Sequence, residues 1–300
     1  MNSGDERSAA ERQESSRRAA LPQLRHPILL AAFSGWNDGA EAATSAVEHL
    51  ALSWDATAVW EIDPDEFYDY QATRPTIRQK EGVTRRIEWP VTSVSTCVLS
   101  GHDRDVILVL GPEPNYRWRT FCSQLVDFAE AANVEMTVML GALLADTPHT
   151  RPVPVSGTAD TAEAAKRLGL ELSRYEGPTG ITGVLSDAFV QAGIPSVSLW
   201  AAVPHYVAHT ANPKATLALL TNLGTVTELP IPLGDLAQRA DEWEEVISEM
   251  TMDDEDMAAY VHELEHASDE DLNDVMLRID GEELAAEFEN YLRKRGDSPD

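Results

Sequence analysis

The sharpest chemical signature in this sequence is a histidine pair in the segment His262-Glu263-Leu264-Glu265-His266. On a helix this spacing puts His262 and His266 one turn apart, where two imidazoles can bind Zn²⁺ while Glu263 activates a metal-bound water. The surroundings argue against such a site, because Glu265 adds a charge inside the motif and acidic clusters flank it. No third ligand follows at the spacing of the extended zinc-protease motif. We therefore expect no metal site here and no cofactor in the chain.

Two glycine-containing loops are the other candidates for binding chemistry, since a loop that opens a helix directs backbone N–H groups toward an anion. They run SGWNDG over residues 34–39 and GPTGITG over residues 177–183. The first lacks the lysine of a phosphate-binding P-loop, and Ser34 lacks the flanking glycines of a nucleophile elbow.

These loops supply the candidate residues for contact with an anion or a partner protein, and we predict no catalytic residue. The candidates are Ser34, Gly35, Trp36, Asn37, Asp38, Gly177, Thr179, Gly180, Thr182 and Gly183. The alternative is purely structural: a tight turn capped by Asp38, and glycines that allow close packing.

A second histidine pair, His205 and His209, follows a predicted strand and precedes Asn212-Pro213. Two histidines alone make an incomplete metal site. We therefore expect a loop at the end of a strand, with these side chains at a surface or an interface.

Short apolar runs alternate with helical patterns through residue 225, and this order places the loops. Strands are predicted over residues 26–33, 57–62, 105–110, 135–143 and 195–202. Helices are predicted over residues 39–52, 117–132, 161–168 and 213–223, and another runs from the 177–183 turn to residue 192. The alternation predicts an α/β fold, a three-layer α/β/α sandwich. The arginine-bearing stretch over residues 67–90 predicts an excursion or hairpin off the sheet.

Charge is spread unevenly along the 300 residues, whose formal net charge is -28. Residues 241–300 hold 22 acidic and 4 basic residues, whereas the first 240 residues hold 29 and 19. This step predicts three parts: a disordered N-terminal tail over residues 1–24, an α/β domain over residues 25–235 and an acidic helical extension over residues 236–300. The negative charge repels nucleic acid and anionic lipid, so neither is expected as a partner.

The acidic extension has apolar residues at helical spacing, which form three stripes. The stripes are Trp243, Val246, Ile247 and Met250; Met257, Val261 and Leu264; and Leu284, Phe288, Tyr291 and Leu292. One hypothesis is that the first stripe packs on the α/β core while the later segment offers an acidic face to a basic partner. The alternative is that the whole extension packs on the core and its charge aids solubility.

Targeting and redox signals are few. No apolar run approaches the roughly 18 residues that a membrane-spanning helix needs, and the N-terminus has no apolar signal region. The chain has two cysteines, Cys97 and Cys122, without a CxxC motif. These features predict a cytoplasmic protein in a reducing compartment.

The order of these segments resembles the PAC2 family, the proteasome assembly chaperone 2-like proteins, in its bacterial form. The resemblance is carried by LLAAFSGWNDGAEAATSAVEHL at residues 29–50, GPTGITGVLSDAFVQAGIPSVSLWAAVPHY at residues 177–206 and NPKATLALLTNL at residues 212–223. It implies a phosphorylase/hydrolase-like sandwich that self-associates into a homo-oligomer. It also implies a chaperone or interaction role with a proteasome-related protein partner, and it supplies no catalytic residues.

We therefore expect a non-enzymatic interaction or assembly protein that binds protein partners. The alternative is an enzyme of hydrolase or phosphorylase type, acting in the crevice at the carboxyl edge of the sheet where α/β proteins bind ligands. Arginine, histidine and carboxylate groups converging around residues 34–38 and 177–183 would favour the enzyme. An apolar surface covered by another subunit would favour the assembly protein.

Overall fold

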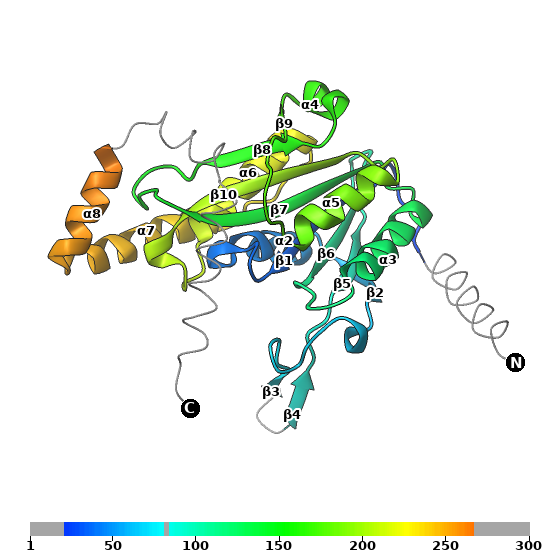
Figure 1. The fold of residues 1–300 in the computed structure, drawn as a ribbon, viewed down its shortest axis with the longest axis horizontal. Helices are drawn as coiled ribbons and strands as arrows, with labels where there is room; N and C mark the ends of the chain where they lie inside the picture. The colour runs from blue at the N-terminus through cyan, green and yellow to red at the C-terminus, as the bar shows by residue number, and fades with distance from the viewer. Residues whose placement is uncertain (1–20, 81–83, 267–300) are drawn as a thin grey trace, which may run out of the picture.

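A computed structural model describes residues 21–80 and 84–266, and its centre is an eight-stranded sheet in the order β2-β5-β6-β1-β7-β10-β8-β9 (Figure 1). The strands are β1 Ile28–Ser34, β2 Thr57–Glu61, β5 Ser93–Cys97, β6 Val106–Pro112, β7 Met136–Ala145, β8 Val155–Ala159, β9 Glu171–Leu172 and β10 Ser196–Pro204. The four central strands β6, β1, β7 and β10 run parallel. Their carboxyl ends therefore share one edge of the sheet.

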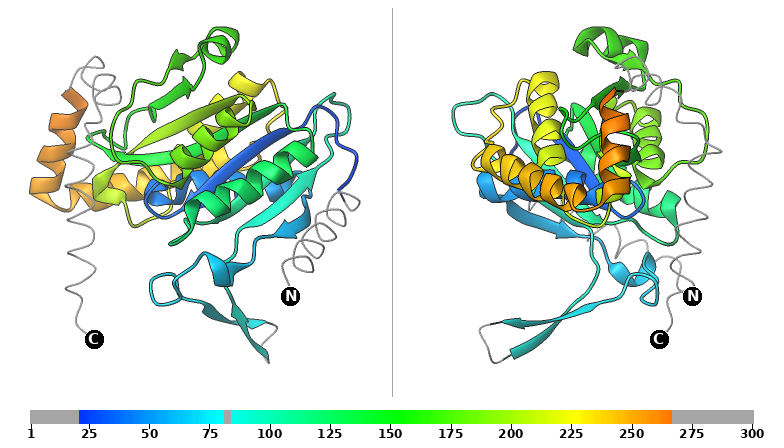
Figure 2. Two further views of the ribbon diagram at one scale, coloured as in Figure 1. Left: turned by 45° about the vertical axis from the view of Figure 1, so that its right-hand side comes forward. Right: turned by 90° about the vertical axis from the view of Figure 1, so that its left-hand side faces the viewer.

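Helices cover both faces of this sheet, which confirms the three-layer α/β/α prediction (Figure 2). They are α2 Ala42–Ser53, α3 Trp118–Ala131, α4 Ala162–Leu168, α5 Ile181–Gln191 and α6 Pro213–Thr227. Helices α2 and α6 pack on the face that buries Ile28 and Leu30, and α3 and α5 pack on the face that buries Leu29 and Phe33. Successive side chains of a strand point to opposite faces. A strand buried on both faces is therefore apolar along its whole length, as β1 is.

Three strands were not predicted from the sequence. Strands β5 and β8 alternate small polar residues with apolar ones, and β9 has only two residues. Such segments lack the apolar run that marks a buried central strand. Strand β5 pairs antiparallel with β2 and β6 toward one side of the sheet, and β8 pairs antiparallel with β10 toward the other.

The helix predicted from Gly39 starts later, at Ala42. The cause is local backbone geometry, because Ala40 and Glu41 both have positive φ, 51° and 55°, which an α-helix does not accommodate. The predicted capping by Asp38 nevertheless occurs. Its carboxylate accepts a hydrogen bond from the backbone N–H of Ala43, at 2.7 Å between N and Oδ1, across the intervening turn.

The predicted excursion from the sheet is confirmed as a β-hairpin. Strands β3 Thr76–Lys80 and β4 Thr84–Glu88 pair antiparallel and form a separate two-stranded sheet. This hairpin extends away from the layered body in every view (Figures 1 and 2).

Two further helices follow the charge step, α7 Leu236–Met252 and α8 Glu255–His266. Trp243 and Ile247 of α7 are buried against Val207. Val246 and Met250 are 54% and 66% exposed, so the predicted first stripe is only half right.

The buried face of α7 is a different helical row. It consists of Leu236, Ala240, Trp243, Ile247 and Thr251. Two members of the second stripe, Val261 and Leu264 in α8, are also buried. The described part of the later segment therefore packs on the molecule, and the third stripe lies outside the described residues. The division of the chain into three parts stays a prediction.

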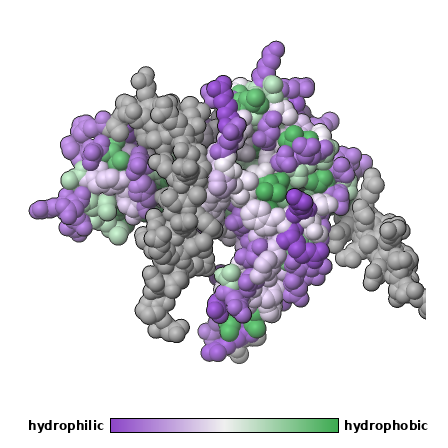
Figure 3. Space-filling view, in the orientation of Figure 1, coloured by the Kyte–Doolittle hydropathy of each residue, from purple (hydrophilic) through white to green (hydrophobic). Residues whose placement is uncertain are grey.

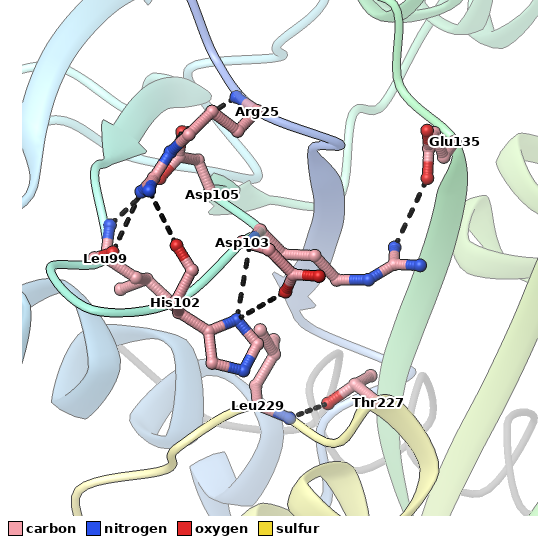
Figure 4. A network of polar contacts seen from close by, with 9 residues as sticks. Arg25, Leu99, His102, Asp103, Asp105, Glu135, Thr227 and Leu229 are labelled. Carbon is pink, nitrogen blue, oxygen red and sulfur yellow. Dashed lines mark hydrogen bonds and ion pairs between the residues drawn. The ribbon is translucent and has the colours of Figure 1, made fainter.

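An ion pair between Arg25 and the buried Asp105 carboxylate ties the segment before β1 to the start of β6 (Figure 4). The Asp105 carboxylate is fully buried and accepts hydrogen bonds from the Arg25 guanidinium and from the Leu99 N–H. Burial alone would raise the pKa of Asp105, but these hydrogen bonds outweigh it and hold the pKa below its usual value. The pair thus fixes β1 beside β6.

In the part of the chain that the structure describes, no helix has both the length and the apolar character needed to cross a membrane.

Candidate functional site

The two loops singled out from the sequence meet at the carboxyl edge of the parallel strands. The 34–39 loop follows β1, and the 177–183 loop leads into α5. Between them lies Glu113, the residue after β6, whose backbone N–H donates to the Ser34 carbonyl at 2.9 Å. Helix α2 after β1 and helix α3 after β6 cover opposite faces of the sheet. In α/β proteins, ligands commonly bind where helices diverge in this way at the carboxyl edge of the sheet.

The Glu113 carboxylate is the centre of the site. Its Oε1 accepts hydrogen bonds from the Ile181 N–H at 2.8 Å and from the Asn37 side-chain amide at 2.9 Å. The Asn37 carbonyl oxygen in turn accepts the Thr182 hydroxyl at 3.0 Å. Asn37 and Thr182 are both buried. One polar chain therefore links β6, the 34–39 loop and the start of α5.

Glu113 occupies the place that an external anion would take. Ile181 is the first residue of α5, and a helix N-terminus carries a partial positive charge and N–H groups without partners inside the helix. Burial raises the pKa of Glu113, and the hydrogen bonds from Ile181 and Asn37 partly offset this effect. The Glu113 carboxylate, which belongs to the chain itself, thus accepts a hydrogen bond from the first N–H group of α5.

Close contact between the loops depends on glycine at two positions. A Cβ on Gly180 would lie 2.2 Å from the Asn37 amide nitrogen, a distance that no side chain can occupy. Gly35 has φ 126°, in a region that residues with a side chain rarely adopt. Gly180 thus lets the two loops approach closely, and Gly35 lets the first loop adopt its turn.

Asp38 belongs to the same loop but points elsewhere. It is buried, and its carboxylate accepts hydrogen bonds from the Thr44 hydroxyl and from the Ala43 N–H. Burial raises the pKa of Asp38 to about 6, partly offset by those hydrogen bonds. Its role is therefore to cap α2.

The other candidates do not converge on Glu113 through their side chains. Ser34 contributes its backbone carbonyl, and Trp36 is half-buried beside it in the loop. Gly177 and Thr179 are exposed, and Gly183 lies inside α5 one turn after Thr179.

The residue that sequence reasoning missed is Glu113. Its signal was a lone carboxylate between Pro112 and Pro114, directly after an apolar strand. That position places a charged group at the sheet edge where it must be solvated or paired.

A second polar cluster lies beyond the carboxyl ends of β7 and β10. His205, the first residue after β10, lies 2.8 Å from the Asp146 carboxylate and 2.9 Å from the Tyr260 hydroxyl. The Tyr260 hydroxyl also donates to Asp146 at 2.6 Å. Because Tyr260 belongs to α8, this triangle attaches α8 to the sheet edge. His209, its predicted companion, is exposed.

A buried histidine lies beside this triangle. His149 is 2.8 Å from the Tyr206 hydroxyl through Nδ1 and 3.0 Å from the Ser248 hydroxyl through Nε2. Lys214 donates to the His149 backbone carbonyl and forms an ion pair with Glu244 of α7. Burial lowers the pKa of His149, and the nearby Glu244 carboxylate partly opposes this effect. The His149 ring joins the sheet edge to α7.

The histidine pair for which we expect no zinc site lies on α8. His262 and His266 are exposed, with ring centroids 4.4 Å apart. Glu265 accepts a hydrogen bond from the Thr150 hydroxyl at 2.5 Å, so the charge that argued against the motif serves to dock α8. Within residues 21–80 and 84–266, no cluster of three or more metal-ligating side chains is present.

Comparison with known proteins adds to this geometry. A model of the PAC2 family matches residues 32–251 of the chain. The chain belongs to the PAC2 family. The matched region of this PAC2 family member includes both loops, Glu113 and most of α7.

Solved structures show relatives over most of the domain. The proteasome-assembly chaperone homologue Rv2125 of Mycobacterium tuberculosis is 55% identical, with 78% of this chain and 99% of that chain covered and a TM-score of 0.71. A PAC2 family protein from Streptomyces avermitilis is 48% identical at the same coverages, with a TM-score of 0.73. PbaA of Pyrococcus furiosus, an archaeal homolog of proteasome-assembly chaperone, covers 77% of this chain and 94% of its own. It is 18% identical with a TM-score of 0.56, and shares the fold. No curated protein matches this PAC2 family chain.

Proposed function

We propose that this protein is a non-enzymatic interaction protein of the proteasome-assembly type, which binds protein partners and associates with further copies of itself. The observation that carries the proposal is the hydrogen bonding of Glu113 at the carboxyl edge of the sheet. The chain's own Glu113 takes the N–H group at the start of α5 that an anionic substrate would use. An enzyme acting there would have to displace a half-buried internal carboxylate from its hydrogen bonds before binding its substrate.

The relatives supply the class of partner. The solved relative from Mycobacterium tuberculosis is described as a proteasome-assembly chaperone homologue, and more than half of its aligned residues are identical to this chain. The net charge of the chain indicates which kind of surface it attracts. A chain with net charge -28 attracts basic protein surfaces and repels nucleic acid and anionic lipid. We therefore propose a proteasome subunit with a basic face as the partner.

We also propose a cytoplasmic location. Cys97 and Cys122 are both buried free thiols, and burial raises the pKa of each to about 12. Neither thiol is poised for disulfide exchange, which fits a reducing compartment.

The direct test is binding of the full chain to purified proteasome α and β subunits from the same cells. Size-exclusion chromatography with light scattering should show a stable complex with one of them at micromolar concentration. Raising the salt concentration should weaken it, because mobile ions screen charge attraction. In a control, serum albumin, which is also acidic, replaces this chain, so that binding to the subunits by charge alone can be measured. The absence of any complex with either subunit, or equal capture of albumin, would contradict the proposal.

A further inference from the structure

The β3–β4 hairpin carries apolar side chains that nothing in the described molecule covers well. Ile77 lies directly opposite Ile87 in the ladder, and these side chains are 65% and 53% exposed. Trp89, just after β4, is 49% exposed, and its ring packs at a tilt of 59° against Tyr70 at the base of the hairpin. An isolated two-stranded hairpin is at best marginally stable in water. A hairpin with an exposed isoleucine pair therefore gains stability if another surface covers it.

The same hairpin is locally basic on a strongly acidic chain. Side chains two apart in a strand share a face, so Arg85 lies on the face of Ile87. On the other face Arg78 lies directly opposite Arg86, an arrangement of like charges that destabilises a ladder. Glu88 forms an exposed ion pair with Arg78 at 2.7 Å. Figure 3 shows hydrophobic and hydrophilic groups side by side over this hairpin. A surface that complements this hairpin would therefore carry acidic side chains together with exposed apolar ones.

The outer face of α7 has this complementary composition. It consists of Glu242, Glu245, Val246, Glu249 and Met250, spaced three and four residues apart and all exposed. Residues at this spacing lie on one face of a helix. The opposite side of α7 is buried against the molecule, so the outer face is held rigidly outward. Val246 and Met250 thus form an apolar strip among carboxylates.

Helix α7 is long enough to receive a five-residue strand, and the two surfaces lie apart on one molecule. The 17 residues of α7 span about 25 Å and a five-residue strand spans about 17 Å. The hairpin and α7 are well separated in every view (Figures 1 and 2), so a copy cannot join its own two surfaces. A contact between different faces of identical chains is heterologous and closes into a ring or extends into a filament.

We infer that the β3–β4 hairpin of one copy docks on the outer face of α7 of a second copy. Ile77, Ile87 and Trp89 then cover Val246 and Met250, while Arg85, on the same face, lies against Glu245 and Glu249. Arg86 adds positive charge from the opposite face of the hairpin. This inference rests on the self-association in the proposed function and identifies the surfaces that mediate it.

A charge exchange tests the inference in the full chain. The variant R85E/R86E makes the hairpin acidic, and the variant E245R/E249R makes the outer face of α7 basic. In each variant alone the hairpin repels α7 of another copy, so the dissociation constant measured by analytical ultracentrifugation should rise at least about tenfold. In an equimolar mixture every contact between unlike variants pairs opposite charges. The mixture should therefore assemble, through contacts between unlike variants, much more tightly than either variant alone.

A matched control separates this effect from net charge. The variant Lys166→Glu/Arg174→Glu changes the net charge as much as R85E/R86E does, at two exposed sites outside the hairpin. It should assemble like the wild type. Circular dichroism should show that all variants are folded, because every changed side chain is exposed.

The outcomes distinguish the inference from the proposed function. If the wild type assembles but R85E/R86E assembles equally well, or the mixture fails to recover assembly, the hairpin contact is wrong and self-association stands. If the wild type remains monomeric at every concentration tested, both self-association and the hairpin contact are wrong.

Discussion

A single carboxylate, Glu113, holds three segments of the chain together at the candidate site. Its desolvation is costly, and the hydrogen bonds from Ile181 and Asn37 offset that cost. Removing either donor would leave a half-buried charge with too few partners. At the residue scale, the site is therefore a structural junction whose polar groups depend on one another.

The hydrogen bonds around Glu113 predict that alanine substitutions at two glycines near the start of α5 change the free energy of unfolding in opposite directions. Gly180→Ala would push the Asn37 amide out of its hydrogen bonds and should lower the free energy of unfolding by about 2–3 kcal/mol. The new Cβ of Gly183→Ala meets the side chain of the exposed Thr179, most closely at its hydroxyl, which can rotate away. This substitution should raise the free energy of unfolding by up to about 1 kcal/mol. Urea denaturation measures both. Equal destabilisation by the two substitutions would contradict the account.

Asp38 predicts a pH dependence of stability. Burial raises its pKa in the folded state from 3.8 to about 6, so protonation favours the folded protein. The stabilising contribution is fully present below about pH 4 and is lost as the pH rises through about 6. Urea denaturation of the wild type and of Asp38→Asn across this range isolates it. The wild type should lose stability relative to the variant as the pH rises, and a constant difference would refute the assignment.

At the element scale, α7 shows how tertiary packing selects one face of a helix that is polar almost all round. Its sequence offers two apolar strips, and the core accepts the strip that holds Trp243 and Ile247. Lys214 of α6 adds an ion pair with Glu244 of α7. The partly buried pair and the aromatic anchor fix the rotation of the helix.

Two alanine substitutions measure that choice of face. Trp243→Ala should lower the free energy of unfolding by about 3 kcal/mol or more, because it leaves a cavity beside Val207. Val246→Ala, on the exposed strip one turn away, should change it by less than about 0.5 kcal/mol. Thermal or urea unfolding compares them. A comparable loss from Val246→Ala would mean that α7 packs by its other face.

The sequence predicts the elements that are apolar throughout and misses those whose placement depends on neighbours. Strand β1 and helix α6 follow from apolar runs and spacing, whereas β5 is recognisable only because β2 and β6 flank it. The two candidate loops are brought together as their glycines suggest. Glu113 was missed because its partners, Asn37 and Ile181, are 76 and 68 residues away in sequence. No local pattern encodes such a contact.

At the scale of the whole molecule, charge and exposed apolar surface are segregated. The outer face of α7 is acidic, the β3–β4 hairpin is basic, and each carries exposed apolar side chains. At the carboxyl edge of the sheet, Glu113 is instead held by internal hydrogen bonds. This arrangement supports the proposal that the molecule binds other proteins.

The most direct test of an interaction role is assembly of the proteasome core from purified α and β subunits, with and without this chain. Native gels taken over time follow the intermediates and the finished particle. We expect the chain to join an early complex and to speed formation of the finished particle. Gly180→Ala should weaken both effects only in proportion to the fraction of chain that it unfolds. If the chain joins no intermediate and leaves the time course unchanged, the proposed function is wrong.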